Sequence, residues 1–246
     1  MPRRQSKFLF ACARLTRETT NRNPKTDSTL RFRPLEMFGD LTETDRFPRG
    51  AVSEWVQDFE TGKNLAPDPD AKQASGYRVL KVSAVTRGMF MPEESKPLPL
   101  SYDPPAAHFV RIGDLLFSRA NTADLIGATA YVDVSAKNLV LPDKIWRFVW
   151  RRAAAPNPHF IHALFSTTAF RRELTKRATG TSGSMKNIAK EKVLQIEVGL
   201  PDRNKQDDFA LAQDRVRSSR NLVSLQAQLL EDQFHSLQSL AFSGQL

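Results

Sequence analysis

The hydrophobic and polar positions at the C-terminal end of the chain repeat with the period of one long amphipathic helix. No glycine or proline occurs between Asp202 and Ser243, so no residue in that stretch interrupts a helix. Apolar residues recur at every seventh position, at Phe209, Val216, Val223, Leu230 and Leu237. Leu222, Leu229 and Phe234 widen this line into a stripe, whereas Gln226 and Gln233 occupy the second seam position.

An apolar stripe of this kind has to be buried against another helix, from the same chain or from a partner. The spacing therefore predicts a spacer helix over residues 202–246, with the five residues of the repeat as helix-pairing positions in a coiled coil. Such a helix extends roughly 50–60 Å, too long to fold back on the preceding domain along its whole length. The alternative is an ordinary terminal helix that packs on its own domain.

Residues 47–201 combine short alternating segments with one amphipathic helix. Alternation of apolar and polar residues predicts a strand over 77–85, and further strands are expected over 115–117, 128–134 and 144–150. Asn157 and Pro158 are typical of a helix start, as cap and first helical residue, and apolar residues continue on one side to about residue 177. We therefore expect a mixed α/β (α+β) domain followed by the long helix.

Proline and glycine mark the interruptions within this domain. Five prolines lie within residues 92–108, so we expect no regular structure over most of that stretch, because proline lacks a backbone N–H. Gly180 is expected to end the helix in a left-handed turn.

The first 46 residues differ from the rest in composition. Residues 1–35 hold nine basic and two acidic side chains and show little apolar periodicity after Leu15. The composition predicts a basic, disordered N-terminal arm over 1–46. An organelle transit peptide or upstream sequence from a wrongly assigned start are the alternatives.

Composition and charge narrow the class of protein. The 246 residues are 40% hydrophobic and 26% charged, as in a soluble globular protein, and no apolar run approaches the ~18–20 residues that cross a bilayer. The single cysteine, Cys12, rules out an internal disulfide and a cysteine-rich zinc module, so a cytoplasmic location is expected. The net charge is +9, and residues 143–192 hold eleven basic and three acidic side chains. A polyanion is therefore the expected partner.

Catalytic and metal-binding patterns are weak throughout the sequence. Residues 102–105 (YDPP) contain the Asp-Pro-Pro core used by amino-methyltransferases, but Ala106 stands where an aromatic would stack on a flipped base. His159 and His162 have no cysteine or carboxylate near them at ligand spacing, and the loop 180–184 lacks the Gly-Lys-Ser/Thr ending of an ATP-binding loop. These features favour a binding protein with no metal over an enzyme.

Two segments have residue types that suit DNA. In residues 113–122 (GDLLFSRANT) an apolar trio precedes Arg119 and Asn121, which can bind guanine and adenine edges, respectively, through two hydrogen bonds. The alternative is that Asp114 and Arg119 pair to hold a turn. The second segment suits phosphate contacts, or else is a solvated helix face with an adjoining loop; its candidate residues are Arg171, Arg172, Lys176, Arg177, Ser182, Ser184, Lys186 and Asn187.

Five stretches stand in the order and spacing of one known family. They are GDLLFSRANTADLIGATAYV, LPDKIWRFVW, ATGTSGSMKNI, VGLPDRNKQDDF and FHSLQSLAFSGQL. Through them the chain resembles the specificity subunit of type I restriction-modification systems, over roughly residues 55–246. The resemblance implies a DNA target-recognition domain over 47–201 and a spacer helix after it, and it implies nothing for residues 1–46.

The resemblance also implies partners. Subunits of this family do no chemistry; they bind double-stranded DNA and dock methyltransferase subunits, which flip an adenine and methylate its N6 atom. Restriction subunits join to cut unmodified DNA. S-adenosylmethionine, ATP and Mg²⁺ are therefore expected on the partner subunits, and no cofactor is expected on this chain.

The sequence departs from the family in one respect. Such subunits usually contain two recognition domains and two spacer helices, whereas this sequence has one of each and no internal repeat. A half-length subunit that pairs with a copy of itself would read a palindromic split site by two-fold symmetry. One half of a split or truncated gene would pair with a different half. The alternative from another class is a structural adaptor whose long helix recruits partners and whose domain does not read DNA.

Overall fold

The computed structural model describes residues 34–64, 74–180 and 185–242, and the chain divides into two compact units. The first unit is a folded domain, Arg33–Leu211, and the second includes the helix from Ala212 onward. The strands are β1 (Arg49–Ala51), β2 (Val56–Thr61), β3 (Ala74–Leu80), β4 (Ser95–Pro99), β5 (Leu115–Ser118), β6 (Ala120–Asn121), β7 (Thr129–Tyr131), β8 (Leu139–Val140), β9 (Ile145–Trp150), β10 (Lys186–Asn187) and β11 (Glu197–Gly199). The helices are α2 (Pro34–Phe38), α3 (Ser83–Thr86), α4 (Pro158–Phe165), α5 (Thr168–Arg177), α6 (Lys190–Leu194) and α7 (Arg203–Phe242), with single 3₁₀ turns at Val52–Glu54, Ala106–His108 and Arg152–Ala154.

A four-stranded antiparallel sheet, in the order β2-β9-β5-β7, forms the centre of the domain. Because side chains alternate between the faces of a strand, its two faces differ in composition. One face is aromatic, with ring centroids of contacting pairs 4.9–6.2 Å apart; its members are Phe59, Phe117, Trp146 and Phe148. Phe165 of α4 packs on this face.

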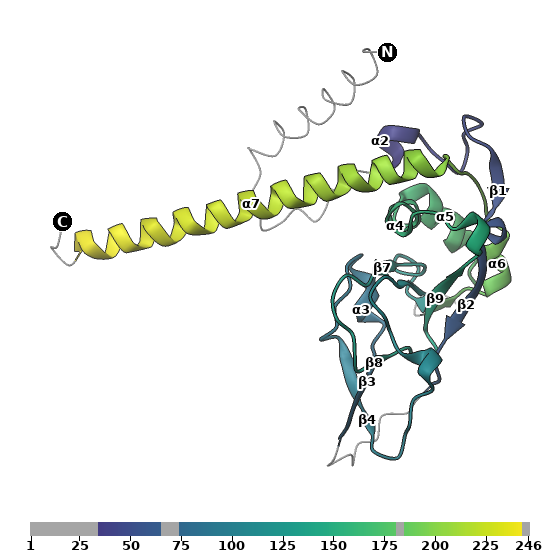
Figure 1. The fold of residues 1–246 in the computed structure, drawn as a ribbon, viewed down its shortest axis with the longest axis horizontal. Coiled ribbons are helices and arrows are strands. Elements are labelled where there is room, and N and C mark those ends of the chain that lie inside the picture. The colour runs from purple at the N-terminus through teal and green to yellow at the C-terminus, as the bar shows by residue number, and fades with distance from the viewer. Residues whose placement is uncertain (1–33, 65–73, 181–184, 243–246) are drawn as a thin grey trace. The chain divides into compact units, whose positions relative to one another are not determined.

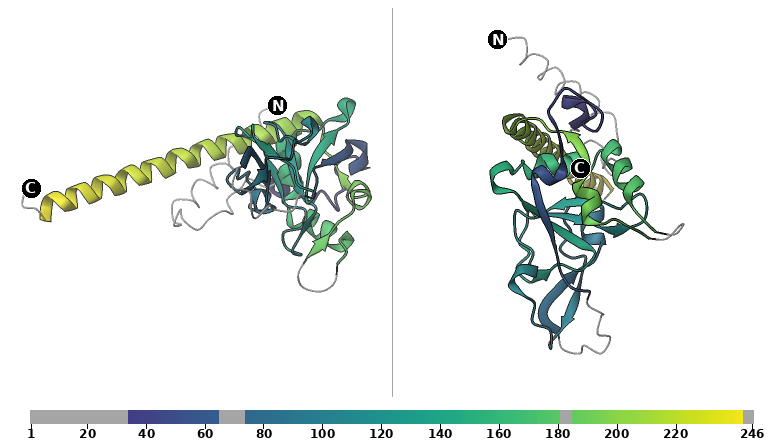
Figure 2. Two further views of the ribbon diagram at one scale, coloured as in Figure 1. Left: turned by 90° about the horizontal axis from the view of Figure 1, so that it is seen from below. Right: turned by 90° about the vertical axis from the view of Figure 1, so that its right-hand side faces the viewer.

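The other face of the sheet is mainly aliphatic. Leu116 and Ile145 of the sheet join one buried cluster with Ala84 and Val85 of α3 and with Leu80 and Leu139 of a second sheet. That second sheet has the order β4-β3-β8 and contains the parallel pair β3–β8. Strands β3 and β4 lie at the end of the domain opposite α2 (Figure 1; Figure 2, right). The expected mixed α/β fold followed by a long helix is confirmed.

Most of the expected strands form, and one further strand forms in the proline-rich stretch, where none was expected. Segments 115–117 and 128–134 pair as β5 and β7, and segment 144–150 forms β9. The strand expected over 77–85 ends at Leu80 as β3, and α3 follows. Most of the proline-rich stretch 92–108 lacks regular structure, as expected, but β4 forms within it and contains Pro97 and Pro99. Strand β4 is an edge strand, where a missing N–H breaks no ladder.

The expected helix start is confirmed, but the helix is two helices. The Asn157 side chain accepts hydrogen bonds from the backbone N–H groups of His159 and Phe160, with Pro158 as the first helical residue. Helix α4 ends at Phe165, and α5 begins anew with Thr167 as its cap. The Thr167 hydroxyl accepts from the Phe170 N–H, so a second capping residue separates the two helices.

The folded domain begins earlier in the chain than the sequence predicts. Residues 1–33 lie outside the described part of the chain, but residues 34–46 belong to the domain. Phe38 is 4% exposed and packs edge-on against Phe160 at 5.6 Å, and Leu41 is also buried. The expectation of a disordered arm is therefore wrong for residues 34–46, because two apolar side chains there complete the core.

Helix α7 begins inside the domain. Phe209 is fully buried, with its ring 5.6 Å from Phe160 and 6.0 Å from Phe38. Gln206, also buried, accepts a hydrogen bond from the Asn157 N–H and donates one to the Pro201 carbonyl. Phe209 was expected to pair with another helix, and this expectation is wrong because its ring is already part of the domain core.

Beyond Ala212 the described apolar residues of α7 are largely exposed. Val216 is partly exposed, and the further positions of the repeat, Val223, Leu230 and Leu237, are 62%, 65% and 54% exposed. Leu222, Leu229 and Phe234 of the wider stripe are also exposed. Within the described residues no helix is both long enough and apolar enough to span a membrane.

Candidate nucleic-acid interface

A short two-stranded ribbon brings together the two segments that the sequence marks for DNA. Strand β6 pairs antiparallel with β10, with Asn121 opposite Lys186 and Ala120 opposite Asn187. The ladder continues beyond β6, since the Ile188 N–H donates to the Arg119 carbonyl at 3.0 Å. Four of the sequence candidates therefore share one edge of the domain: Arg119, Asn121, Lys186 and Asn187. We call these four residues, together with Lys144 beside Arg119, the β6–β10 edge.

The chain enters this edge through a glycine. Thr179 and Asn187 exchange two backbone hydrogen bonds of 2.8 Å, so the segments around them run side by side. Gly180 has φ +137°, and a Cβ there would lie 2.5 Å from the Met185 carbonyl oxygen. Only glycine fits such an approach. Gly180 lies three residues after α5 ends at Arg177, so its place is in the ribbon rather than at the helix end.

The Arg119 side chain binds Asp143 and is partly exposed to solvent. Its Nε donates to the Asp143 carbonyl at 2.7 Å, and its Nη2 lies 3.4 Å from the Asp143 carboxylate. The Arg119 side chain is 30% exposed. Asp114 is not its partner, so the alternative of an Asp114–Arg119 pair is wrong.

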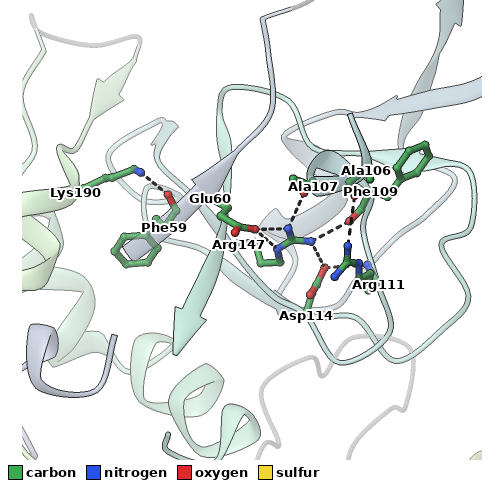
Figure 3. Close-up of polar contacts among 9 residues, drawn as sticks. All are labelled: Phe59, Glu60, Ala106, Ala107, Phe109, Arg111, Asp114, Arg147 and Lys190. Atoms are coloured by element: carbon green, nitrogen blue, oxygen red, sulfur yellow. Dashed lines mark hydrogen bonds and ion pairs between the residues drawn. The ribbon is translucent and has the colours of Figure 1, made fainter. Parts of the chain in front are cut away.

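Asp114 instead belongs to an ion cluster around the buried Arg147, which the sequence did not reveal. Figure 3 shows the Arg147 guanidinium between Glu60 and Asp114, with the carbonyls of Ala107 and Phe109 completing its contacts. Its side chain is 8% exposed. Burial raises the pKa of the Asp114 carboxyl, although the Arg111 N–H and Arg147 act to lower it. The cluster fixes the loop 106–111 against the sheet.

Asn121 is partly exposed and lies opposite Lys186 in the ribbon. Its Oδ1 accepts a hydrogen bond of 2.9 Å from the Thr122 N–H, and its Nδ2 lies 3.5 Å from the Ser118 hydroxyl. The amide is therefore oriented by its own strand. It keeps hydrogen-bonding capacity for a ligand, because a side-chain amide has two donors and an acceptor.

The basic residues of α5 are engaged in other ways. Arg171 donates to the Asp124 carbonyl, and burial lowers the pKa of its guanidinium. The Thr175 hydroxyl donates to the Ala123 carbonyl at 3.3 Å. Arg171 thus anchors the loop that follows β6, and it is placed to support the β6–β10 edge rather than to extend it.

Glu173 offsets part of the charge of α5. Lys176 lies 2.7 Å from its carboxylate, and Arg177 donates to both the carboxylate and the backbone carbonyl of Glu173. Hydrogen bonds from Lys176 and then from Arg177 hold the pKa of Glu173 below its ordinary value. Arg172 is exposed. Ser182 and Ser184 lie outside the described residues.

Lys144 and Asp143 are the residues of this edge that the sequence analysis missed. The Lys144 carbonyl accepts from the Arg119 N–H at 3.1 Å, so β9 begins beside Arg119. The available signal was the excess of basic residues over 143–192, which begins at these two positions. In the described part of the chain, no group of three or more His, Cys, Asp or Glu side chains could hold a metal ion.

The fold is thus a mixed α/β domain with a basic ribbon edge, joined to a long helix. No protein-family model matches the chain. Its sequence is 25% identical over 174 residues to the type I restriction enzyme EcoEI specificity subunit of Escherichia coli, across 69% of this chain and 29% of that protein. This similarity confirms the resemblance to type I specificity subunits.

Two solved structures are also similar to the chain. One is the type I restriction-modification S subunit from M. genitalium, with a TM-score of 0.45, 16% identity, and coverage of 80% of this chain and 48% of that one. The other is the HsdS subunit from Thermoanaerobacter tengcongensis, with a TM-score of 0.47, 15% identity, and coverage of 82% and 46%. The chain therefore spans less than a third of the curated relative and about half of each solved one.

Proposed function

We propose that this chain is the DNA-reading part of a type I restriction-modification specificity subunit, and that the β6–β10 edge contacts the target. The observation that carries the proposal is the pairing of β6 with β10, in which Asn121 lies opposite Lys186 and the Ile188 N–H donates to the Arg119 carbonyl. Side chains that bind base edges and side chains that bind phosphates are both needed for a sequence-specific contact. The similarity to a specificity subunit supports the same function.

In this function Arg119 and Asn121 read base edges, and Lys144, Lys186 and Asn187 hold phosphates. Arg172, Lys176 and Arg177 of α5 add to the positive field with weaker contacts, because Glu173 binds two of them. The chain itself is non-catalytic. Methyltransferase subunits methylate adenine and restriction subunits cut the DNA, and these subunits hold the cofactors.

Helix α7 is the proposed means of pairing two recognition domains. Val216, Val223, Leu230 and Leu237 are its pairing residues, with Phe209 removed from the set by its burial in the domain. A homodimer would place two copies of the β6–β10 edge on a two-fold palindromic site. Leu230→Asp should prevent this association, whereas Gln228→Asp, two positions away and on the opposite side of the helix, should not, as measured by sedimentation equilibrium.

A randomised pool of DNA duplexes tests the function directly. The full chain should enrich one motif from the pool, and it should bind that motif at least about 10³-fold more tightly than a scrambled duplex at the same salt concentration. A protein that binds both duplexes alike does not read sequence. The exposed stripe of α7 would then favour the structural adaptor, which recruits partners through this helix.

A further inference from the structure

The backbone of Arg119 is bonded to two neighbouring segments of the domain. Its backbone N–H donates to the Lys144 carbonyl at 3.1 Å, and its backbone carbonyl accepts from the Ile188 N–H at 3.0 Å. These two hydrogen bonds fasten it between the beginning of β9 and the end of β10. The backbone of Arg119 therefore cannot shift without breaking two of the contacts that build the edge.

Asp143 binds the guanidinium of Arg119 but leaves some of its N–H donors without a partner. A guanidinium has five N–H donors in a rigid planar fork. One donates to the Asp143 carbonyl at 2.7 Å, and another faces the Asp143 carboxylate at 3.4 Å. No other hydrogen bond of this guanidinium exists among the described residues. With 30% of the side chain exposed, the remaining donors are available to a ligand.

Asp143 is itself fixed by the strand on its other side. The Thr61 hydroxyl lies 3.2–3.4 Å from the carbonyls of Gly62, Pro142 and Asp143, and its one proton can be donated to any of them. The Gly62 N–H donates to the Pro142 carbonyl at 3.2 Å. A Cβ at Gly62 would lie 1.6 Å from the Leu141 carbonyl oxygen, so glycine is required for this close approach. The end of β2 thus sets the position of Asp143, and through it that of Arg119.

We propose that Asp143 is a positioning residue that sets the base preference of this domain by presenting Arg119 to a guanine. The inference rests on the proposed DNA-reading function. A guanidinium already held in one orientation loses less conformational freedom when it binds the O6 and N7 acceptors of guanine. The carboxylate of Asp143 also repels DNA phosphates, so it disfavours a non-specific phosphate contact by Arg119.

The test is a double-mutant cycle on base discrimination with the full chain. A randomised duplex pool first yields the preferred motif, and affinities are then measured for that motif and for duplexes changed at each guanine. Arg119→Ala should lose about tenfold discrimination at one guanine position. Asp143→Ala removes the carboxylate contact at 3.4 Å but keeps the backbone carbonyl that accepts from the Arg119 Nε, so it should lose a smaller factor, about threefold, at the same position. Its affinity for a scrambled duplex should stay equal or rise. In the Arg119→Ala background, Asp143→Ala should cause no further loss.

Two further variants separate positioning from simple loss of structure. Arg119→Lys keeps the charge but not the two-pronged contact, so it should lose the guanine preference and keep the salt dependence of binding. Asp45→Ala, an exposed acidic residue near the start of the domain, should leave discrimination unchanged. Each variant is compared with the unchanged chain in denaturant unfolding. If Asp143→Ala does not fold, Asp143→Leu, which is similar in size and accepts no hydrogen bond, takes its place in the cycle.

The outcomes distinguish the inference from the function on which it rests. If the pool yields no motif, both the DNA-reading function and the inference are wrong. If a motif appears but Asp143→Ala keeps the guanine preference, only the inference is overturned. The same holds if Asp143→Ala loses equal discrimination with and without Arg119, because the residue then does not act through that arginine.

Discussion

Arg147 lies in the central sheet and Arg119 directly follows one of its strands. Each binds an aspartate and a backbone carbonyl, yet the two are suited to different tasks. Arg147 sits within β9, is 8% exposed, and meets two carboxylates and two carbonyls. Arg119 directly follows β5, is 30% exposed, and meets only Asp143. A basic side chain is therefore available for DNA only when its contacts within the protein leave some of its N–H donors without a partner. A count of charges along the sequence does not show this.

The largest expected effect comes from removing Arg147 from its ion cluster with Glu60 and Asp114. Arg147→Ala leaves Asp114 buried without its cation, and removing one member of a buried ion pair costs about 3–5 kcal/mol. Arg119→Ala should cost less than about 1 kcal/mol, because its pair with Asp143 is partly exposed. Denaturant unfolding measures both variants. Equal losses of unfolding free energy in the two variants would show that the buried Arg147 and the partly exposed Arg119 contribute alike to stability.

The loss in Arg147→Ala should depend on pH. Burial raises the pKa of Asp114, so the folded chain binds this proton more tightly than the unfolded chain does. The contribution of Asp114 to stability therefore falls as pH rises through its folded pKa. Without Arg147 the ionised carboxylate is more costly, so the destabilisation relative to the unchanged chain should be largest at neutral pH and shrink toward about pH 4. Unfolding of both proteins across this range checks the sign.

The next effect compares the edge with α5. Lys186 lies in the ribbon, and the only hydrogen bond of its side chain among the described residues is to the Gly180 carbonyl at 3.2 Å. Lys176, by contrast, is paired with Glu173. Lys186→Ala should reduce the slope of log affinity against log salt by about one unit, as expected for one lost phosphate contact. Lys176→Ala should change it by less than about half a unit. The reverse order would place the phosphate contacts on α5.

The smallest effect comes from releasing the α5 cations. Glu173→Gln removes the carboxylate that binds Lys176 and Arg177, so affinity for a scrambled duplex should rise by about twofold at low salt. Because the pKa of Glu173 is lowered in the folded chain, its stabilisation is present above its ordinary pKa and is lost as the pH falls. The variant should lack that part of the acid dependence. A fall in DNA affinity would show that Glu173 orders cations that DNA needs.

The sequence could predict those features that depend on neighbouring residues. The Asn157 cap, the strands β5 and β9, and the long α7 all follow from local pattern. The break between α4 and α5 was also visible in principle, because Thr167 is a capping residue three positions before a buried phenylalanine. Nothing local, however, distinguishes Phe209 from Leu230, since both belong to one heptad repeat and only the domain core buries the first.

Features that depend on distant pairing could not be predicted. Arg119 and Asp143 are 24 residues apart, and Arg147 and Glu60 are 87 apart, so their partners were beyond any spacing rule. The sequence named the basic residues of both DNA segments but gave the α5 cations the same weight as the ribbon. For Arg171 the difference arises from the Asp124 carbonyl, 47 residues away. Glu173, by contrast, binds Lys176 and Arg177 at the local i,i+3 and i,i+4 spacings, which the sequence already contained.

Lysine acetylation tests most directly whether the β6–β10 edge contacts DNA. The full chain is acetylated with and without its enriched duplex, and mass spectrometry measures the modification of each lysine. Lys144 and Lys186 should become strongly protected by the duplex, while the exposed Lys176 of α5 should stay reactive. Protection of Lys176 with no change at Lys144 and Lys186 would contradict the account, because the DNA would then lie on α5 instead of on the ribbon.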